Sequence, residues 1–322
     1  MSAAAVQTVV DLGGEEILAL LERTESRMNE LASGHGELLG RYAGQTIAAG
    51  GKRLRPLLVF LAAGAPPPST DGLLRAAVAV ELVHGATLIH DDVLDGSPLR
   101  RGRPTVFATG GRSIAIATGD LLFSRAFAEL AMTGSVESVR VLARASRELA
   151  AGEVMQRADA FATELSVERY LERCRLKTAV LFRAACELGA LQAHGMLSAL
   201  AAFGEQIGLA FQILDDVLDV TGPPERTGKP RGADLLDGTV TLPLIVARRR
   251  DPDIAAVDLR DVRTPAEAAT LCDRIAATEA LDDARGHALE LVRQAKLSLP
   301  ALPRRQRTAL RLVADGVVER YT

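Results

Sequence analysis

Residues Leu82 to Asp95 read LVHGATLIHDDVLD, and residues Ile207 to Asp219 read IGLAFQILDDVLD. The pentad DDVLD therefore occurs twice, each time at the end of an apolar run. On a helix, the first and fifth residues of such a pentad share one face, with their Cβ atoms about 6 Å apart. Two carboxylates at that distance repel each other by about 3 kcal/mol at an effective dielectric constant of about 20, so each pentad needs a cation. A single acidic pentad is typical of a solvated helix end, but two identical copies predict one cation site built from two helices.

The composition favours an all-α protein in one domain. Hydrophobic residues make up 48% of the 322 residues, whereas aromatic residues make up only 3% and Trp is absent. A chain in which Ala and Leu dominate is suited to helices rather than to strands, which favour β-branched and aromatic residues. No segment of different composition divides the chain, so we expect a single domain over residues 1–322, with residues 1–13 as a flexible N-terminus.

Apolar periodicity predicts helices along most of the chain, separated by segments rich in Gly and Pro. The predicted helices span residues 14–33, 36–49, 56–64, 71–94, 112–132, 135–161, 166–188, 195–220, 238–249, 264–276, 279–298 and 303–320. No alternating pattern is long enough for a convincing strand. Residues 239–246 come closest, but Pro243 argues against a central strand there.

Charge and cysteine content exclude several classes of partner. The net charge of −3 and the isoelectric point of about 6.0 give no reason to expect nucleic acid. Cys174, Cys186 and Cys272 lack the spacing of a disulfide framework or a zinc site, so the reducing cytoplasm is the expected location. The first residues lack the basic region of a signal peptide. The longest uncharged run, Leu188 to Gly204, contains three glycines and is a poor membrane span, so we expect no integral membrane segment.

The paired acidic pentads point to magnesium. Hard carboxylate oxygens suit Mg²⁺, which keeps several waters and is usually bound by one or two carboxylates together with substrate phosphates. The competing metal site is a di-iron carboxylate bundle, because Glu81 and His84 match Glu-x-x-His. That site needs a second Glu-x-x-His from another helix, and this sequence has none. Mg²⁺ with a polyanionic substrate is therefore the favoured interpretation.

Basic groups alternate with the two acidic pentads. They are GGKRLRP at residues 50–56, LRRGRPT at residues 99–105, the pair Lys177-Thr178, and GKPRG at residues 228–232. Any one of them would be typical of a solvated surface, but four together predict a site for two diphosphates, one bound through metal and the other directly by Arg and Lys. The sequence has no G-x-x-x-x-G-K-[ST] loop and no Gly-x-Ser-x-Gly elbow. A site without a strong nucleophile or base suits loss of a diphosphate, attack of an alkene on the resulting carbocation, and removal of a proton by the released diphosphate.

In this order the motifs resemble the trans-isoprenyl diphosphate synthases, the polyprenyl synthetase family, and most of all its medium- and long-chain members. The resemblance rests on the two DDxxD pentads, GGKRLRP, LIHDDVLD followed by LRRGRPT, the Lys-Thr pair, FQILDDVLD and GKPRGADLLDGTVTLPLI, and it extends over residues 45–320. It implies an all-α bundle of about ten or more helices around a central apolar cavity. It also implies a homodimeric enzyme that condenses isopentenyl diphosphate with an allylic diphosphate, using about two or three Mg²⁺ ions per site.

The resemblance assigns roles residue by residue. The implied metal site comprises the direct ligands Asp91, Asp95 and Asp215 and their partners Asp92 and Asp219, with Asp216 as a further partner. The allylic diphosphate is expected to be held by Arg100, Lys177 and Lys229. Isopentenyl diphosphate is expected to be held by Lys52, Arg55, His84 and Arg101. Gln212 and Thr178 are expected to line the reacting centre, with Glu153 and Gln156 as secondary candidates. The implied catalytic group is thus Asp91, Asp95, Asp215, Lys177, Lys229, Gln212 and Thr178.

Small residues before the first pentad predict a long product. In this family a bulky aromatic residue five positions before the first Asp marks short-chain enzymes, and here that position is Ala86, followed by Thr87. The pentad also lacks the two-residue insertion of bacterial farnesyl and geranylgeranyl diphosphate synthases. Each added isoprene unit buries five carbons, worth about 4 kcal/mol, so only a steric floor stops growth. Phe123 or Phe127 on the next helix is the candidate floor. We expect about six to ten units, with geranylgeranyl diphosphate as the alternative.

Two other functions share some of these features. A class I terpene cyclase also uses DDxxD and Mg²⁺, but such enzymes line the pocket with aromatic residues that stabilise carbocations, and this chain has few. A non-catalytic subunit of a heteromeric synthase is the other alternative. Such subunits lose acidic motifs or phosphate-binding basic residues, whereas this sequence keeps both sets.

Overall fold

A computed structural model describes residues 9, 15–33, 36–48, 50–64, 70–100, 102–193, 196–222 and 230–319. Helices dominate these residues, and the all-α prediction is confirmed. The α-helices are α2 (Glu15–Ser33), α3 (Glu37–Ala48), α4 (Leu54–Ala63), α5 (Asp71–Leu94), α6 (Val106–Ala131), α7 (Val136–Ala158), α8 (Val167–Cys174), α9 (Val180–Gln192), α10 (Leu197–Thr221), α12 (Ala233–Leu236), α13 (Leu242–Arg250), α14 (Pro252–Ala255), α15 (Pro265–Ala276), α16 (Ala280–Ser298) and α17 (Arg304–Glu319). A π-helical turn, η1 (Arg175–Ala179), joins α8 to α9, and a 3₁₀ turn, η2 (Leu259–Asp261), precedes α15.

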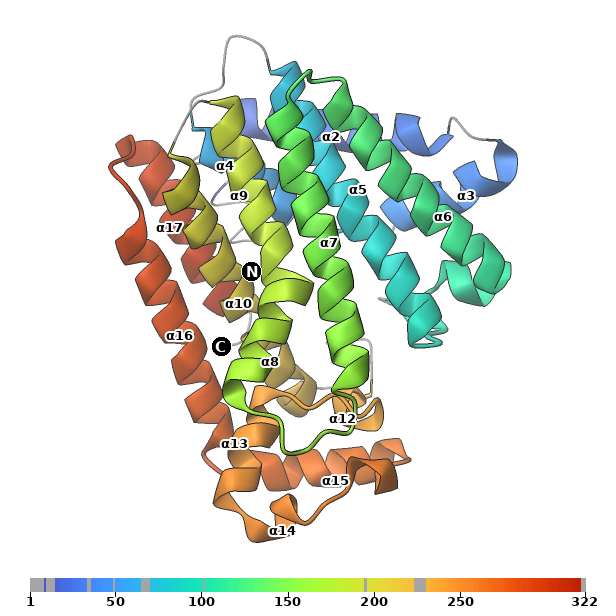
Figure 1. Cartoon of the computed structure of the whole chain (residues 1–322), viewed down its shortest axis with the longest axis vertical. Helices are drawn as coiled ribbons and strands as arrows, with labels where there is room; N and C mark the ends of the chain where they lie inside the picture. Colours follow the sequence, from blue (N-terminus) through green and yellow to red (C-terminus); the bar gives the residue numbers. More distant parts are fainter. Residues whose placement is uncertain are drawn as a thin grey trace.

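The long helices lie side by side in a bundle, with α12 to α15 gathered at one end (Figure 1). Helix α5 packs against α6 and α9, and α10 packs against α9 and α16. Both helices that end in DDVLD are therefore central elements, which explains their apolar composition on several faces. By length and composition α5 and α10 resemble membrane spans, but 67% of the apolar stretch of α5 and 50% of that of α10 are buried inside the bundle.

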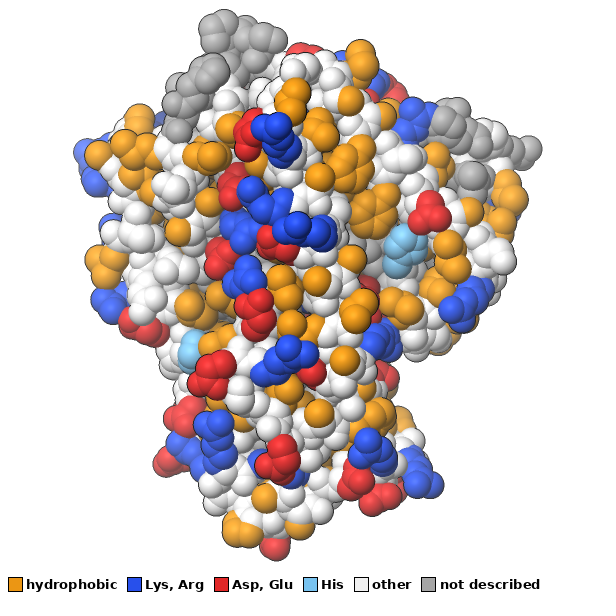
Figure 2. All heavy atoms as spheres, viewed as in Figure 1, with side chains coloured by type: hydrophobic (Ala, Val, Ile, Leu, Met, Phe, Trp, Pro, Cys, Tyr) orange, Lys and Arg blue, Asp and Glu red, His pale blue; other side chains and the backbone are white. Residues whose placement is uncertain are grey.

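One hydrophobic core runs from α2 to α17 and includes the fully buried Tyr170, Phe60, Phe182 and Phe203. Of residues 1–13, for which we expected a flexible N-terminus, only Val9 is described, and it is buried in this core. Ion pairs also join α7, α9 and α10, since Arg183 donates to Glu148 at 2.6 Å and to Glu205 at 2.9 Å. Figure 2 shows basic and acidic side chains in a band on the face that these helices present.

The helix predictions are confirmed in outline, with several differences. The short helices α12 and α14 and the turn η2 were not predicted, and α13 begins at Leu242 rather than at residue 238. Helix α6 begins at Val106 rather than at residue 112, because Gly111 (φ 76°) joins two helical segments across a kink and Thr105 caps the first of them. The predicted helix 166–188 begins as expected, with the Ser166 hydroxyl accepting from the backbone N–H of Arg169, but it is interrupted by η1. A two-stranded hairpin, β1 (Leu99–Arg100) and β2 (Arg103–Pro104), forms within the basic segment after the first pentad.

Candidate active site

The end of α5 carries the first pentad. Asp91 and Asp92 lie in its last turn and Asp95 follows the helix directly. Burial raises the pKa of Asp91 to about 6; Lys177 opposes the rise, and the negative charges of Glu153 and Asp95 reinforce it. A carboxylate that is costly to ionise beside two others is a place where a cation is favourable.

Two basic side chains lie among these carboxylates. Lys177 Nζ is 2.5 Å from Glu153 Oε2, and Arg157 donates to Glu153 Oε1 at 3.0 Å and to Asp95 Oδ1 at 2.6 Å. Acidic residues of α5 and α7 thus alternate with cations of α7 and η1. Glu153 was only a secondary candidate in the sequence, and Arg157 was not predicted at all. Their spacing of four on one helix face was the available signal.

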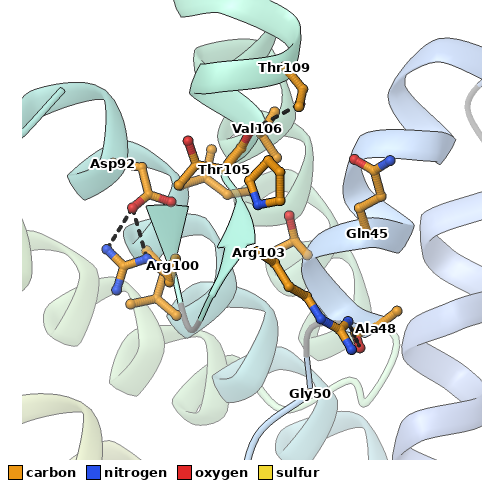
Figure 3. Close-up of a pocket in the computed structure, with 13 residues that line it drawn as sticks. Gln45, Ala48, Gly50, Asp92, Arg100, Arg103, Thr105, Val106 and Thr109 are labelled. Carbon is orange, nitrogen blue, oxygen red and sulfur yellow. Dashed lines mark hydrogen bonds and ion pairs between the residues drawn. The ribbon is translucent and has the colours of Figure 1, made fainter. Parts of the chain in front are cut away.

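Asp92 has a different environment from Asp91. It is 5% exposed, and Arg100 donates from Nε and Nη2 to its Oδ1 at 2.8 Å (Figure 3). A buried carboxylate held by a guanidinium fork joins α5 to strand β1. Asp92 therefore supports the hairpin.

The second pentad lies in the last turns of α10. Asp216 is buried, and it accepts hydrogen bonds from the Tyr170 hydroxyl and from Gln212 Nε2, each at 2.7 Å. Thr178 in turn donates to Gln212 Oε1 at 2.6 Å. Burial, together with the nearby charge of Asp234, raises the pKa of Asp216. These hydrogen bonds connect α8, η1 and α10, and they orient Thr178 and Gln212, the two residues expected at the reacting centre.

Tyr170 is the one residue of this hydrogen-bonded group that the sequence analysis did not predict as part of the site. It is fully buried, and burial followed by the charge of Asp216 raises the pKa of its hydroxyl. The only signal was its rarity, because the sequence contains three tyrosines and this one lies seven residues before Lys177.

Asp215 and Asp219 lie on either side of this hydrogen-bonded chain along α10. Both are half-buried. Asp219 Oδ2 accepts the backbone N–H of Asp234 at 3.2 Å, which ties the end of α10 to the start of α12.

The π-helical turn η1 places Lys177 and Thr178. A wide turn of this kind inside a helix is uncommon and frequent at functional sites. Two glycines pack against it: a Cβ on Gly152 of α7 would lie 2.7 Å from the backbone nitrogen of Lys177, and one on Gly208 of α10 would lie 2.6 Å from Cα of Ala179. The turn is therefore enclosed by the backbones of α7 and α10, with Lys177 directed to Glu153 and Thr178 to Gln212.

Three of the other basic candidates lie among the described residues. Lys52 is exposed just before α4, His84 is half-buried on α5, and the Arg55 guanidinium lies 4.7 Å from the ring centroid of Phe182. Lys229 and Arg101 lie outside the described residues.

A cavity of about 610 Å³ extends from the charged residues between α5, α6 and α7. Asp91, Glu153, Arg157 and Lys177 line one part of it, while Ile116, Phe123 and Leu149 give another part an apolar wall. Of the residues predicted to set chain length, Thr87 and Phe123 line this cavity. Ala86 is fully buried in the core beside it, and Phe123 stacks on His90 with ring centroids 5.9 Å apart.

The carboxylates of the site suit a Mg²⁺ ion that also binds water and substrate better than a metal ion held by protein ligands alone. Asp91, Asp95 and Glu153 offer hard oxygens, but among the described residues no three acidic, His or Cys side chains converge closely enough to hold an ion alone. Mg²⁺ keeps several waters and accepts substrate oxygens, so such an open carboxylate set suits an ion shared with a diphosphate.

Comparison with known proteins agrees with this geometry. Residues 37–272 match the family described as Polyprenyl synthetase. Heptaprenyl diphosphate synthase component 2 from Geobacillus stearothermophilus is 42% identical over 255 residues, which are 78% of this chain and 79% of that protein. The structure of a decaprenyl diphosphate synthase from Rhodobacter capsulatus has a TM-score of 0.89 at 32% identity, covering 98% of this chain and 99% of that one. A polyprenyl synthase from Caulobacter crescentus CB15, complexed with calcium and isoprenyl diphosphate, has a TM-score of 0.86 at 37% identity, covering 98% of both chains.

The family match covers most of the chain, and the similarity to these relatives extends over the two acidic pentads and the helices that carry them. The chain therefore belongs to the polyprenyl synthetase family of divalent-metal-dependent trans-prenyltransferases.

Proposed function

We propose that this chain condenses isopentenyl diphosphate with an allylic diphosphate to make a trans-polyprenyl diphosphate of medium or long chain. The observation that carries this proposal is the cavity whose charged part contains Asp91, Glu153 and Lys177 and whose wall continues with Ile116 and Phe123. A diphosphate head fits the charged part, and an isoprenoid tail fits the apolar part, where each methylene contributes about 0.8 kcal/mol.

Mg²⁺ is the proposed cofactor, with Asp91, Asp95 and Asp215 as its ligands and Asp92 and Asp219 as their partners. When bound, Mg²⁺ would neutralise the leaving diphosphate and so promote its departure. The chain's own contribution is to hold these carboxylates apart. Arg100 fixes Asp92, while Asp219 is tied to the backbone of Asp234. The two pentads are therefore unequal, and the first would supply more of the metal site.

The basic residues would hold the two substrates. Lys177, on the enclosed η1 turn and facing the cavity, is placed to bind the allylic diphosphate with Arg100 and Lys229. Lys52, Arg55, His84 and Arg101 would bind isopentenyl diphosphate. Thr178 and Gln212, held by Asp216 and Tyr170, would line the reacting centre.

Product length would be set on α5 and α6. Phe123 lines the cavity, whereas Phe127 is not among the residues that line it, so Phe123 is the better candidate for the floor. Because Ala86 and Thr87 are small, growth to about six to ten units remains the main expectation. Geranylgeranyl diphosphate is the alternative if the stacked rings of Phe123 and His90 stay fixed.

A homodimer is the proposed assembly. Three apolar residues that line the cavity, Leu94, Ile116 and Val154, are 46%, 39% and 69% exposed. Exposed apolar residues around a site for a hydrocarbon chain favour a covering partner. The relative from Geobacillus stearothermophilus is named as component 2 of a synthase, so a heteromeric partner is the competing possibility.

A single polyprenyl synthetase domain over residues 1–322, in the cytoplasm, completes the proposal. Cys174, Cys186 and Cys272 are free and buried, as expected in a reducing compartment.

The test is incorporation of labelled isopentenyl diphosphate by the purified chain alone, with farnesyl diphosphate and Mg²⁺. We expect incorporation that stops when a chelator removes the metal. A correctly folded chain that is inactive alone but active with a second protein would support the heteromeric alternative. Release of cyclic hydrocarbons from farnesyl diphosphate alone would contradict the proposal in favour of a cyclase.

A further inference from the structure

Two arginines bind the last carbonyl groups of α3. Arg53 Nη2 donates to the carbonyl oxygen of Ile47 at 2.9 Å, and Arg103 Nη1 donates to that of Ala48 at 3.2 Å. The final carbonyls of a helix lack partners within the helix and carry the negative end of its dipole. The last turn of α3 contains no basic residue of its own, so these two guanidinium groups supply the positive charge there.

Arg53 belongs to the segment GGKRLRP and is held from three sides. Its backbone has φ 46° and ψ 39°, a left-handed conformation that is uncommon for a residue other than Gly. Its side chain is 12% exposed and donates to Glu81 Oε1 of α5 at 2.8 Å and to Glu25 Oε2 of α2 at 3.0 Å. Strain of this kind persists only where surrounding contacts fix the residue. These contacts fix the backbone between Lys52 and the first turn of α4.

Arg103 belongs to the hairpin within LRRGRPT. A cavity of about 360 Å³ lies between this hairpin, the end of α3 and α5, with Gln45 on one side and Thr105 on the other (Figure 3). Packing across a cavity cannot fix the distance between its walls. The contact from Arg103 to Ala48 spans it, while Arg100 holds the neighbouring strand to Asp92.

We propose that Arg53 and Arg103 are positioning residues, which hold both basic segments to the end of α3 and thereby set the spacing of the groups that bind isopentenyl diphosphate. The inference rests on the proposed function and deepens it. Lys52 and Arg55 flank Arg53 in one segment, and Arg101 precedes Arg103 by two residues in the other. Loss of either anchor should therefore weaken binding of isopentenyl diphosphate. The allylic diphosphate, expected at Arg100, Lys177 and Lys229, should be bound as before, because Arg100 keeps its own contact with Asp92 and Lys177 lies on η1.

The test uses the full chain and four variants. Arg53→Asn removes the guanidinium but keeps a residue that tolerates the left-handed conformation. Arg103→Gln removes the other anchor from an exposed position, and Arg103→Lys restores a cation with a single donor group. Arg27→Gln is the matched control, because Arg27 also joins α2 to another helix, through Glu129 of α6, but does not contact α3 in that way.

We measure KM for each substrate separately, together with equilibrium binding of isopentenyl diphosphate by calorimetry. Losing a charge-assisted hydrogen bond should raise both the KM and the dissociation constant for isopentenyl diphosphate about fivefold or more. The KM for the allylic substrate should stay within about twofold, and Arg103→Lys should recover part of the loss. Arg27→Gln should leave both KM values unchanged.

Unchanged binding of isopentenyl diphosphate in Arg53→Asn and Arg103→Gln, or equal rises in both KM values, would overturn the inference. If Arg53→Asn does not fold, the inference is judged on the two variants of the exposed Arg103, Arg103→Gln and Arg103→Lys. If the wild-type chain binds isopentenyl diphosphate but forms no product, the proposed function fails, and the anchors are still judged by the calorimetric constants.

Discussion

Arg157 Nη2 lies 2.6 Å from Asp95 Oδ1 and so places a cation on a carboxylate that is expected to bind magnesium. The same guanidinium contacts Glu153, which in turn pairs with Lys177. Positive side chains therefore balance the first acidic pentad from within the protein. A divalent cation that binds Asp95 therefore competes with Arg157 for the charge of this carboxylate.

Replacing Arg157 with Gln should increase the affinity for Mg²⁺. The pair is partly exposed, and such pairs contribute up to about 1 kcal/mol, so we expect half-saturation at a Mg²⁺ concentration up to about fivefold lower. The thermal midpoint measured across a Mg²⁺ titration gives this value without turnover. The control is Arg140→Gln on the same helix, which breaks only an exposed pair with Glu137. A higher Mg²⁺ requirement in Arg157→Gln would show that Arg157 assists the metal rather than competing with it.

Phe123→Ala should lengthen the product. Phe123 lines the cavity and stacks on His90, so its removal opens space for at least one further isoprene unit, whose burial is worth about 4 kcal/mol. Phe127→Ala, one turn further along α6, is the control and should leave the product unchanged. Ala86→Phe should shorten the product by pushing side chains into the cavity. Sizing of dephosphorylated products checks all three variants, and a longer product from Phe127→Ala alone would place the floor there.

Tyr170→Phe should destabilise the protein and slow the reaction. The buried hydroxyl donates to Asp216, and a buried acceptor that loses its partner costs about 1–3 kcal/mol. The Asp216–Gln212–Thr178 chain would also lose its anchor, so kcat should fall more than KM changes. Denaturant unfolding and steady-state kinetics measure the two effects. Tyr42→Phe loses only a long hydrogen bond of 3.4 Å to Thr109 and should be nearly neutral. Equal effects of both variants would argue against a special role for Tyr170.

The cysteines should be unreactive in the folded protein. Burial raises the pKa of Cys272 to about 12 and raises the pKa values of Cys174 and Cys186 further. The thiolate is the reactive form, so at about pH 8 almost no reactive thiol exists, and reactivity should rise only as the solution becomes strongly alkaline. A thiol reagent should therefore modify none of the three residues until denaturant is added. Rapid labelling of the native protein would show that one of these sites opens to solvent.

Sequence reasoning reached the elements that depend on local pattern. The two apolar runs that end in DDVLD became α5 and α10, and Ser166 caps α8 as expected. It did not reach features produced by contact between distant segments. The turn η1 is enclosed by Gly152 and Gly208, which lie on other helices, and a single helical pattern over residues 166–188 contains no sign of it.

The same limit explains what the sequence left out of the site. Tyr170 gains its role only because Asp216, on a helix far along the chain, is buried against it. Arg157 and Asp95 are likewise on different helices, and only packing of α7 beside α5 brings them together. The acidic pentads could be predicted because three aspartates within five residues end each apolar run, a pattern that packing alone does not require.

We propose that the cavity beginning at Asp91 and Lys177 holds a growing isoprenoid chain. The most direct measurement is mass spectrometry of the dephosphorylated products made by the purified wild-type chain from isopentenyl diphosphate, farnesyl diphosphate and Mg²⁺. We expect a dominant alcohol of about six to ten isoprene units. A dominant alcohol of four units or fewer would contradict the long-chain cavity, and the absence of any elongated alcohol would contradict the claim itself.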